Sequence, residues 1–299
     1  MQAGAFFSAY NRSQVMTLEI RPATMSDAEK LGDICYRAFD DISRRHGFET
    51  DFESPAMAQM ILSGLIREER CHSVTALEDG TPVGSNFIAT PDDVGGIGPI
   101  SIDPERQGKG FGRALMEDVL GHARENGIER VRLMQDAFNM QSLSLYASLG
   151  FDTKVGAALL VPAAVDVPEV RPATAEDMEA VERLSGEIYG TSRRREVESM
   201  ANGPFQPFVY EKSGRVVAYF IPGMVGHGVG ETEEALVAVV LGATKHVAEP
   251  FARAFCPLTE GALFRRFLAA GCKVRKVMNL MTLGPYEEPR GPWMPSVLF

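Results

Sequence analysis

The stretch DPERQGKGFGRALMEDVL, residues 103–120, places three alternating glycines directly before a pattern typical of an amphipathic helix. The start of a helix carries unpaired backbone N–H groups and a dipole that attract anions. Glycines there let the backbone approach a ligand closely. Arg106, Lys109 and Arg113 add positive charge around them. The stretch is therefore predicted to hold a pyrophosphate.

The spacing of these glycines distinguishes the stretch from two common nucleotide-binding loops. It lacks the GK[ST] of a P-loop, and GxGxG differs from the GxGxxG of dinucleotide folds. On these residues alone, the alternative is a glycine-rich turn between a strand and a helix, with its basic side chains in water.

A second motif, NMQSLSLYASLGF, covers residues 139–151. Asn139, Ser142 and Tyr146 are spaced by three and four residues, which puts them on one face of a helix. Together with the Q-x-x-G-x-G pattern from Gln107, this N-x-x-S-x-x-x-Y-x-x-x-G-F pattern makes the first half of the chain resemble the GNAT acyltransferase superfamily. The resemblance implies an acetyl-CoA-dependent N-acetyltransferase that acts on a primary amine by direct transfer.

The resemblance also implies where acetyl-CoA binds. The backbone of Ile100 and Ile102 would pair with the pantetheine arm, and Asn139 and Ser142 would bond the cofactor's amide and phosphate groups. Gln107 opens the loop. The amides expected to hold the pyrophosphate are those of Gly108, Lys109, Gly110, Phe111, Gly112 and Arg113.

Tyr146 resembles the general acid of the family, which gives a proton to the departing thiolate. Its ordinary pKa near 10 keeps a tyrosine protonated at neutral pH. The alternative is a half-buried packing residue. The general base stays open, because residues 95–102 carry no acid; Asp136, Asp92 and Asp93 are weak candidates beside a water chain. No metal is expected, and His46 and His72 are expected on the surface or near the substrate.

The chain contains an internal repeat. LEIRPATMSDAEKLGDICYRAF starts at residue 18 and PEVRPATAEDMEAVERLSGEIY at residue 168, so matching positions lie 150 apart. Because strands alternate with helices in each copy, we expect an α/β fold of two tandem GNAT folds, each with a mixed central sheet flanked by helices. The predicted parts are an N-terminal extension (1–16), a catalytic domain (17–161) and a degenerate domain (168–299).

Residue patterns also predict the local elements of the first copy. The expected strands lie near 73–78, 82–89, 97–102, 130–136 and 155–161, and the expected helices near 26–40, 54–68, 110–126 and 139–148. The Pro/Gly-rich tail from residue 284 is expected to pack as an irregular strap.

The second copy has its own GxGxG, from Gly226 to Gly230, but three glutamates between 231 and 234 would repel a pyrophosphate. Phe267 stands where Tyr146 stands in the first copy, and a phenyl ring has no proton to donate. The second copy is therefore predicted to be non-catalytic and to help shape the acceptor pocket. The arginines at 193–195 are expected to form a solvated face.

Composition narrows the choice of partners and compartment. A formal net charge of −10 argues against general nucleic-acid binding, which relies on Lys and Arg. Four separated cysteines suggest reduced thiols in a cytoplasm, and no apolar run reaches the roughly 20 residues of a membrane span. The acceptor is a small-molecule or peptide amine, and the oligomeric state is open. Alternative functions are a non-enzymatic acyl-CoA sensor and a transferase for longer acyl chains or hydroxyl acceptors.

Overall fold

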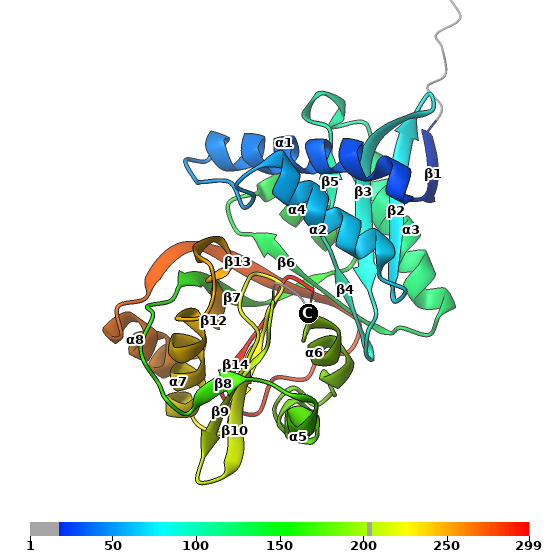
Figure 1. Ribbon diagram of the computed structural model, residues 1–299. Helices are drawn as coiled ribbons and strands as arrows, with labels where there is room; N and C mark the ends of the chain where they lie inside the picture. Colours follow the sequence, from blue (N-terminus) through cyan, green and yellow to red (C-terminus); the bar gives the residue numbers. More distant parts are fainter. Residues whose placement is uncertain (1–17, 202–204, 299) are drawn as a thin grey trace, which may run out of the picture.

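The computed structural model describes residues 18–201 and 205–298, so the predicted extension 1–16 lies outside the described residues (Figure 1). The strands and helices predicted in the first half are present, except that the strand expected at 97–102 is interrupted: one strand ends at Ile97 and the next covers only Ser101–Ile102. The first half consists of β1 (Leu18–Pro22), α1 (Ala28–Arg45), α2 (Pro55–Arg67), β2 (Cys71–Glu78), β3 (Thr81–Ala89), β4 (Val94–Ile97), β5 (Ser101–Ile102), α3 (Phe111–Glu125), β6 (Arg130–Asp136), α4 (Met140–Ser148) and β7 (Asp152–Val161).

The second half repeats this order in a shorter form. It consists of β8 (Val170–Pro172), α5 (Met178–Tyr189), α6 (Arg194–Met200), β9 (Phe208–Lys212), β10 (Arg215–Phe220), β11 (Gly228–Gly230), α7 (Glu233–Thr244), β12 (Ala254–Pro257), α8 (Gly261–Ala269), β13 (Lys273–Leu283) and β14 (Trp293–Met294). The expected strap is confirmed, with β14 as a short strand within it.

The sequence repeat produces the same local structure twice. Asp27 accepts a 2.7 Å ion pair from Arg21 and closes a capping box at the entry to α1. Asp177 does the same at the entry to α5, where Arg171 lies 2.8 Å away. In each case a buried carboxylate accepts a hydrogen bond from the backbone N–H of the threonine three residues earlier, Thr24 or Thr174, and fixes the preceding strand beside it.

The two halves exchange strands. The larger sheet has the order β1-β2-β3-β4-β6-β13-β7-β12, so β13 of the second half lies between β6 and β7 of the first. In turn, β7 lies between β13 and β12 of the second half. Figure 1 shows these strands crossing the middle of the molecule. The sheet therefore runs across the linker at residues 162–168, where the sequence suggests a domain boundary.

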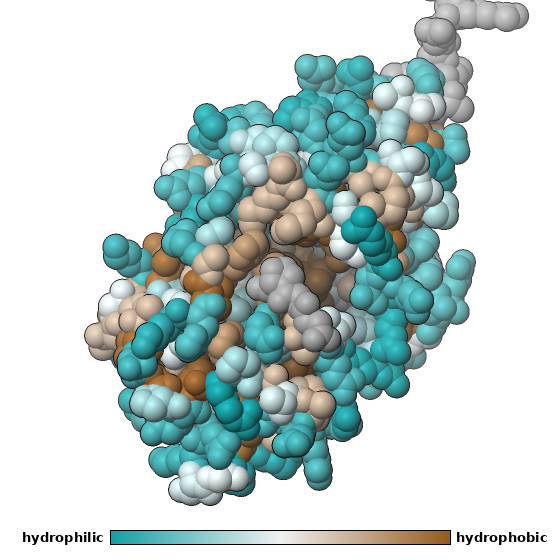
Figure 2. Space-filling model, viewed as in Figure 1, coloured by the Kyte–Doolittle hydropathy of each residue, from teal (hydrophilic) through white to brown (hydrophobic). Residues whose placement is uncertain are grey.

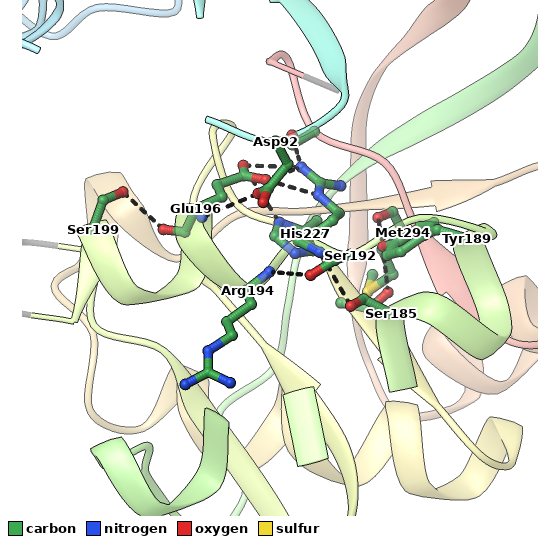
Figure 3. A network of polar contacts seen from close by, with 12 residues as sticks. Asp92, Ser185, Tyr189, Ser192, Arg194, Glu196, Ser199, His227 and Met294 are labelled. Carbon is green, nitrogen blue, oxygen red and sulfur yellow. Dashed lines mark hydrogen bonds and ion pairs between the residues drawn. The ribbon is translucent and has the colours of Figure 1, made fainter. Parts of the chain in front are cut away.

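A buried polar network ties the second half to a loop of the first. Arg193 is fully buried and donates to Glu196 at 2.7 and 2.9 Å. The backbone N–H of Glu196 donates to Asp92, on the loop between β3 and β4. Figure 3 shows Glu196 facing Asp92 and His227. The expected solvated face is therefore wrong for Arg193, because a buried carboxylate three residues on neutralises its charge.

The same network anchors the C-terminal strap. The hydroxyl of Tyr189 donates to the carbonyl oxygen of Met294 at 2.7 Å, and Arg193 donates to Ser296 at 3.3 Å. The strap then continues to Leu298, whose carbonyl oxygen would lie only 1.4 Å from a β-carbon at Gly96. Only a glycine at this position of β4 lets the strap pass.

Candidate active site

The site begins where two neighbouring strands separate. β4 and β6 pair in parallel from Val94 to Gly96, and the pairing stops there. Beyond this point β5 stays with β3, through Ser85 and Ser101, while β6 continues along β13. A cavity of about 490 Å³ lies here, with Gly98–Ile102 along one side and Met134–Asp136 along the other.

The glycine loop forms one end of this cavity. Gly108 and Gly110 have φ angles of +80° and +90°, in the left-handed region that favours glycine. Among the described residues, nothing lies within 4 Å of a β-carbon built on either one. Gly110 is also the N-cap of α3, and having no side chain it cannot cover the first amides of that helix. The loop therefore fits an anionic ligand such as a pyrophosphate.

The charge of the loop is partly balanced by a residue that sequence reasoning missed. Glu78, at the end of β2, pairs with Arg106 at 2.6 Å and with Lys109 at 2.8 Å. Arg113 instead donates to the hydroxyl of Ser148 at 2.6 Å. Arg106 and Arg113 line the cavity. Glu78 is distant in sequence from the loop, so no local pattern indicated this pairing.

The polar residues of α4 form a helix cap. Asn139 is the N-cap, and its Oδ1 accepts a 3.1 Å hydrogen bond from the backbone of Ser142. The hydroxyl of Ser142 donates to the carbonyl oxygen of Asn139, and Gln135 donates to that hydroxyl at 3.0 Å. Gln135 thereby joins β6 to the start of α4 beside the cavity. Neither sequence motif includes Gln135.

Tyr146 borders the same cavity from α4 and is only 6% exposed. Burial, and then the nearby charge of Asp136, raise the pKa of its hydroxyl above the ordinary value. The phenol therefore stays protonated at neutral pH and can donate a proton.

The three acids considered as the general base lie in different places. Asp136, at the end of β6, borders the cavity. Asp92 accepts the hydrogen bond from Glu196 in the buried network, and Asp93 is 80% exposed beside Arg130. Burial, only partly offset by Lys276, raises the pKa of Asp136 to about 6. Asp136 is thus the one of the three that can reach a ligand in the cavity.

Asp136 belongs to a buried cluster drawn from three elements. Lys276 of β13 lies 2.6 Å from Asp136 and 2.7 and 2.8 Å from the two oxygens of Asp51, in the loop between α1 and α2. All three side chains are less than 9% exposed. Asp51 and Lys276 are 225 positions apart, so no local residue pattern predicts this contact.

The glycine segment of the second half has a different structure. Gly228–Gly230 form strand β11, and Thr232 caps α7 only two residues later, its hydroxyl accepting a 3.1 Å hydrogen bond from Ala235. Between β11 and α7, where every residue is described, there is no counterpart of the glycine loop that leaves the first amides of α3 uncapped. Phe267 is fully buried on α8. These features support the prediction of a non-catalytic second half.

The cavity gathers nearly all the residues selected from sequence. Those that line it are Ile100, Ile102, Gln107, Gly108, Gly110, Phe111, Gly112, Arg113, Asn139, Ser142 and Tyr146. Lys109 lies beside them, on Glu78. Within residues 18–201 and 205–298, no group of three His, Cys, Asp or Glu side chains could hold a metal ion, and no helix is long and apolar enough to cross a membrane.

Comparison with known proteins finds a family match for this region. Residues 35–151, less than half of the chain, match the Acetyltransferase (GNAT) family. Mycothiol acetyltransferases of Thermomonospora curvata and Kocuria rhizophila are 39% identical over 77 residues and 41% identical over 59 residues. The matches cover 25% and 20% of this chain and only 26% and 20% of those relatives, about a quarter of their length or less.

Solved structures extend the likeness to the whole fold. A Pyrococcus horikoshii protein, assigned provisionally as an acetyltransferase, superimposes with a TM-score of 0.75 at 16% identity and covers 94% of both chains. A GCN5-related N-acetyltransferase from Sphaerobacter thermophilus has a TM-score of 0.57 at 15% identity, covering 91% of this chain and 97% of its own. The expected α/β architecture is confirmed, and the larger sheet is mixed through the parallel pair β4–β6. The smaller sheet, of order β14-β11-β10-β9-β8, is antiparallel throughout, so a mixed sheet in the second half was a wrong expectation.

Proposed function

We propose that the protein is an N-acetyltransferase that moves an acetyl group from acetyl-CoA to a primary amine. One observation carries the proposal: the open glycine loop at the start of α3 and the protonated Tyr146 border a single cavity. The GNAT family match of residues 35–151 supports it. The match to mycothiol acetyltransferases is too short to carry their acceptor over to this chain.

The cofactor would lie along the cavity from α3 to Tyr146. The amides from Gly108 to Arg113 would hold its pyrophosphate, and the backbone of Ile100 and Ile102 would align its pantetheine arm. When bound, acetyl-CoA supplies an acetyl thioester whose C–S bond breaks as a C–N bond forms with the acceptor. The N-terminal amides and dipole of α3 favour the diphosphate.

Tyr146 and Asp136 would move the protons. An acceptor ammonium must lose two protons in becoming an amide, and Asp136 takes these from its nitrogen and passes them to solvent. Tyr146 gives one proton to the departing sulfur and regains it from solvent. Of the two protons that the ammonium loses, one therefore ends on the thiol of coenzyme A and one is released to solvent. General acid and base groups of this kind each contribute about 10² to 10⁴ in rate.

Two measurements test the proposal together. Calorimetric titration with coenzyme A should give one site per chain, and release of thiol from acetyl-CoA should depend on an added primary amine. A second site of equal affinity would contradict the assignment to the first half. Tight binding of coenzyme A without turnover on any amine would favour an acyl-CoA sensor. Failure to bind coenzyme A would contradict both the transferase and the sensor.

A further inference from the structure

The cavity extends well beyond the residues proposed to hold the cofactor. None of the groups proposed to bind acetyl-CoA or move protons lines this further part. Its remaining walls come from α1, α2 and their connecting loop, and from the second half. We call this part the acceptor chamber and define it by the apolar residues Phe39, Phe52, Ile61, Phe205, Met224 and Phe251. In Figure 2 a hollow between the two halves is bordered by such apolar surface.

Two aromatic pairs give the acceptor chamber its shape. Phe39 and Phe52 of the first half meet edge to face, with ring centroids 5.2 Å apart. Phe205 and Phe251 of the second half do the same at 5.4 Å. Such pairs hold their rings in defined orientations and offer large apolar faces. The chamber is therefore built for an apolar body rather than for a hydrated one.

The charged groups beside the acceptor chamber carry a net negative charge. Among the described lining residues that come from α1, α2, their loop and the second half, Asp51 is the only charged side chain. Asp136 borders the same cavity from β6. With Lys276 between them, two carboxylates and one ammonium sum to −1. A buried net charge is costly unless a partner of opposite sign joins it, so this cluster favours a cationic ligand.

We propose that the acceptor is an amphipathic primary amine, with one ammonium group on an alkyl or aryl-alkyl body. Asp51 holds the ammonium beside Asp136, and the body packs against the two phenylalanine pairs. This inference rests on the proposed function, because it names the acceptor of that same site. A polyhydroxylated amine would instead lose the hydration of its hydroxyl groups against phenyl rings.

The test is a series of amines at saturating acetyl-CoA: n-butylamine, n-hexylamine, 2-phenylethylamine and glucosamine. Burying one methylene is worth about 0.8 kcal/mol, so kcat/KM should rise about fourfold per methylene from butyl to hexyl. Glucosamine should fall at least about tenfold below n-hexylamine.

Variants separate the contribution of the apolar walls to acceptor binding from the contribution of the Asp51 carboxylate. Phe251→Ala should flatten the butyl-to-hexyl rise, whereas Phe48→Ala, whose ring stacks on Phe138 outside the cavity lining, should leave it intact. Asp51→Asn leaves Lys276 paired with Asp136. The substitution should raise the KM of every amine by about tenfold, because the ammonium loses a hydrogen bond to a charged group. The KM of acetyl-CoA should stay unchanged.

Binding provides a readout that does not need turnover. Calorimetry on the protein loaded with coenzyme A should detect 2-phenylethylamine and not glucosamine at equal concentration. If glucosamine bound or reacted as well as n-hexylamine, this inference would be overturned while the transferase assignment stood. If octanoyl-CoA with glucosamine outperformed acetyl-CoA with n-hexylamine, the chamber would house the acyl chain instead. Failure to bind coenzyme A would refute the proposed function itself.

Discussion

At the scale of single residues, burial acts on Tyr146 and Asp136 with opposite consequences for their chemistry. It raises the pKa of the phenol away from neutrality, so the proton stays available for the leaving sulfur. It raises the pKa of the carboxyl group toward neutrality, to about 6, so the carboxylate becomes a stronger base while remaining ionised at pH 7. A general acid or base works best with a pKa near the working pH. Burial therefore brings Asp136 toward that optimum, whereas it keeps the Tyr146 proton in place but makes the phenol a weaker acid.

Tyr146→Phe removes the acidic proton and keeps the ring. We expect kcat to fall at least about tenfold, because the thiolate would leave without a proton donor. The dissociation constant of coenzyme A should stay nearly unchanged, since the hydroxyl does not hold the cofactor's phosphates. Stopped assays of kcat and calorimetry of binding check the two parts, and an unaltered kcat would remove Tyr146 from the mechanism.

Asp136 should give the reaction an acidic limb. The base must be ionised to accept a proton, so kcat should fall as the pH drops below about 6, the pKa of this carboxyl group. In Asp136→Asn we expect a lower rate, by about 10² or more, and the loss of that limb. The measurement is kcat between pH 5 and 8 for both proteins. A limb that survives the substitution would assign it to another group.

At the scale of elements, the two halves differ most in the link between a strand and the next helix. In the first half, eight residues separate β5 from α3, and they include two left-handed glycines. In the second half only Glu231 and Thr232 separate β11 from α7, and Thr232 caps the helix itself. Under the proposed function, loop length and the identity of the N-cap decide whether this fold offers an anion site at the start of the helix.

Gly110→Asp tests the loop directly. Aspartate would add a negative charge beside the expected diphosphate, so we expect coenzyme A to bind at least about tenfold more weakly. Gly127→Asp is the matched control, because Gly127 also has a left-handed φ, of +70°, and open space around it but lies beyond the far end of α3. Equal loss of affinity in both variants would point to general strain rather than to the loop.

Local sequence patterns were enough to predict the glycine loop before α3 and most of the neighbouring helices and strands. Glycines before a helix, and polar residues spaced by three and four along α4, depend on residues close in sequence. The predicted strands and helices of the first half agree with the structure to within a few residues, except for the strand expected at 97–102, which is interrupted between β4 and β5. The contacts of Glu78 and of Asp51 with Lys276 were not predicted, because side chains far apart in sequence meet only when the sheet has formed.

At the scale of the whole molecule, the strand exchange gives the second half a part in the site proposed for the first. β13 fills the place between β6 and β7, and it brings Lys276 to Asp51 and Asp136. Alternation along a strand shows which side chains face the core but not which strand lies next to it. Local sequence patterns therefore could not predict the strand exchange, and they could not predict that Arg193 is fully buried.

The exchange predicts that neither half folds by itself. A fragment of residues 18–161 would leave β6 and β7 without the strand between them, and a fragment of residues 162–298 would leave β12 and β13 without β7. Exposed strand edges of this kind leave rows of backbone N–H and C=O groups free to pair with another chain, which favours aggregation. We expect dispersed amide NMR signals and cooperative thermal unfolding from the two fragments produced together, but not from either one alone. A separate first fragment that unfolds cooperatively and binds coenzyme A would show that the shared sheet is dispensable for the cofactor site.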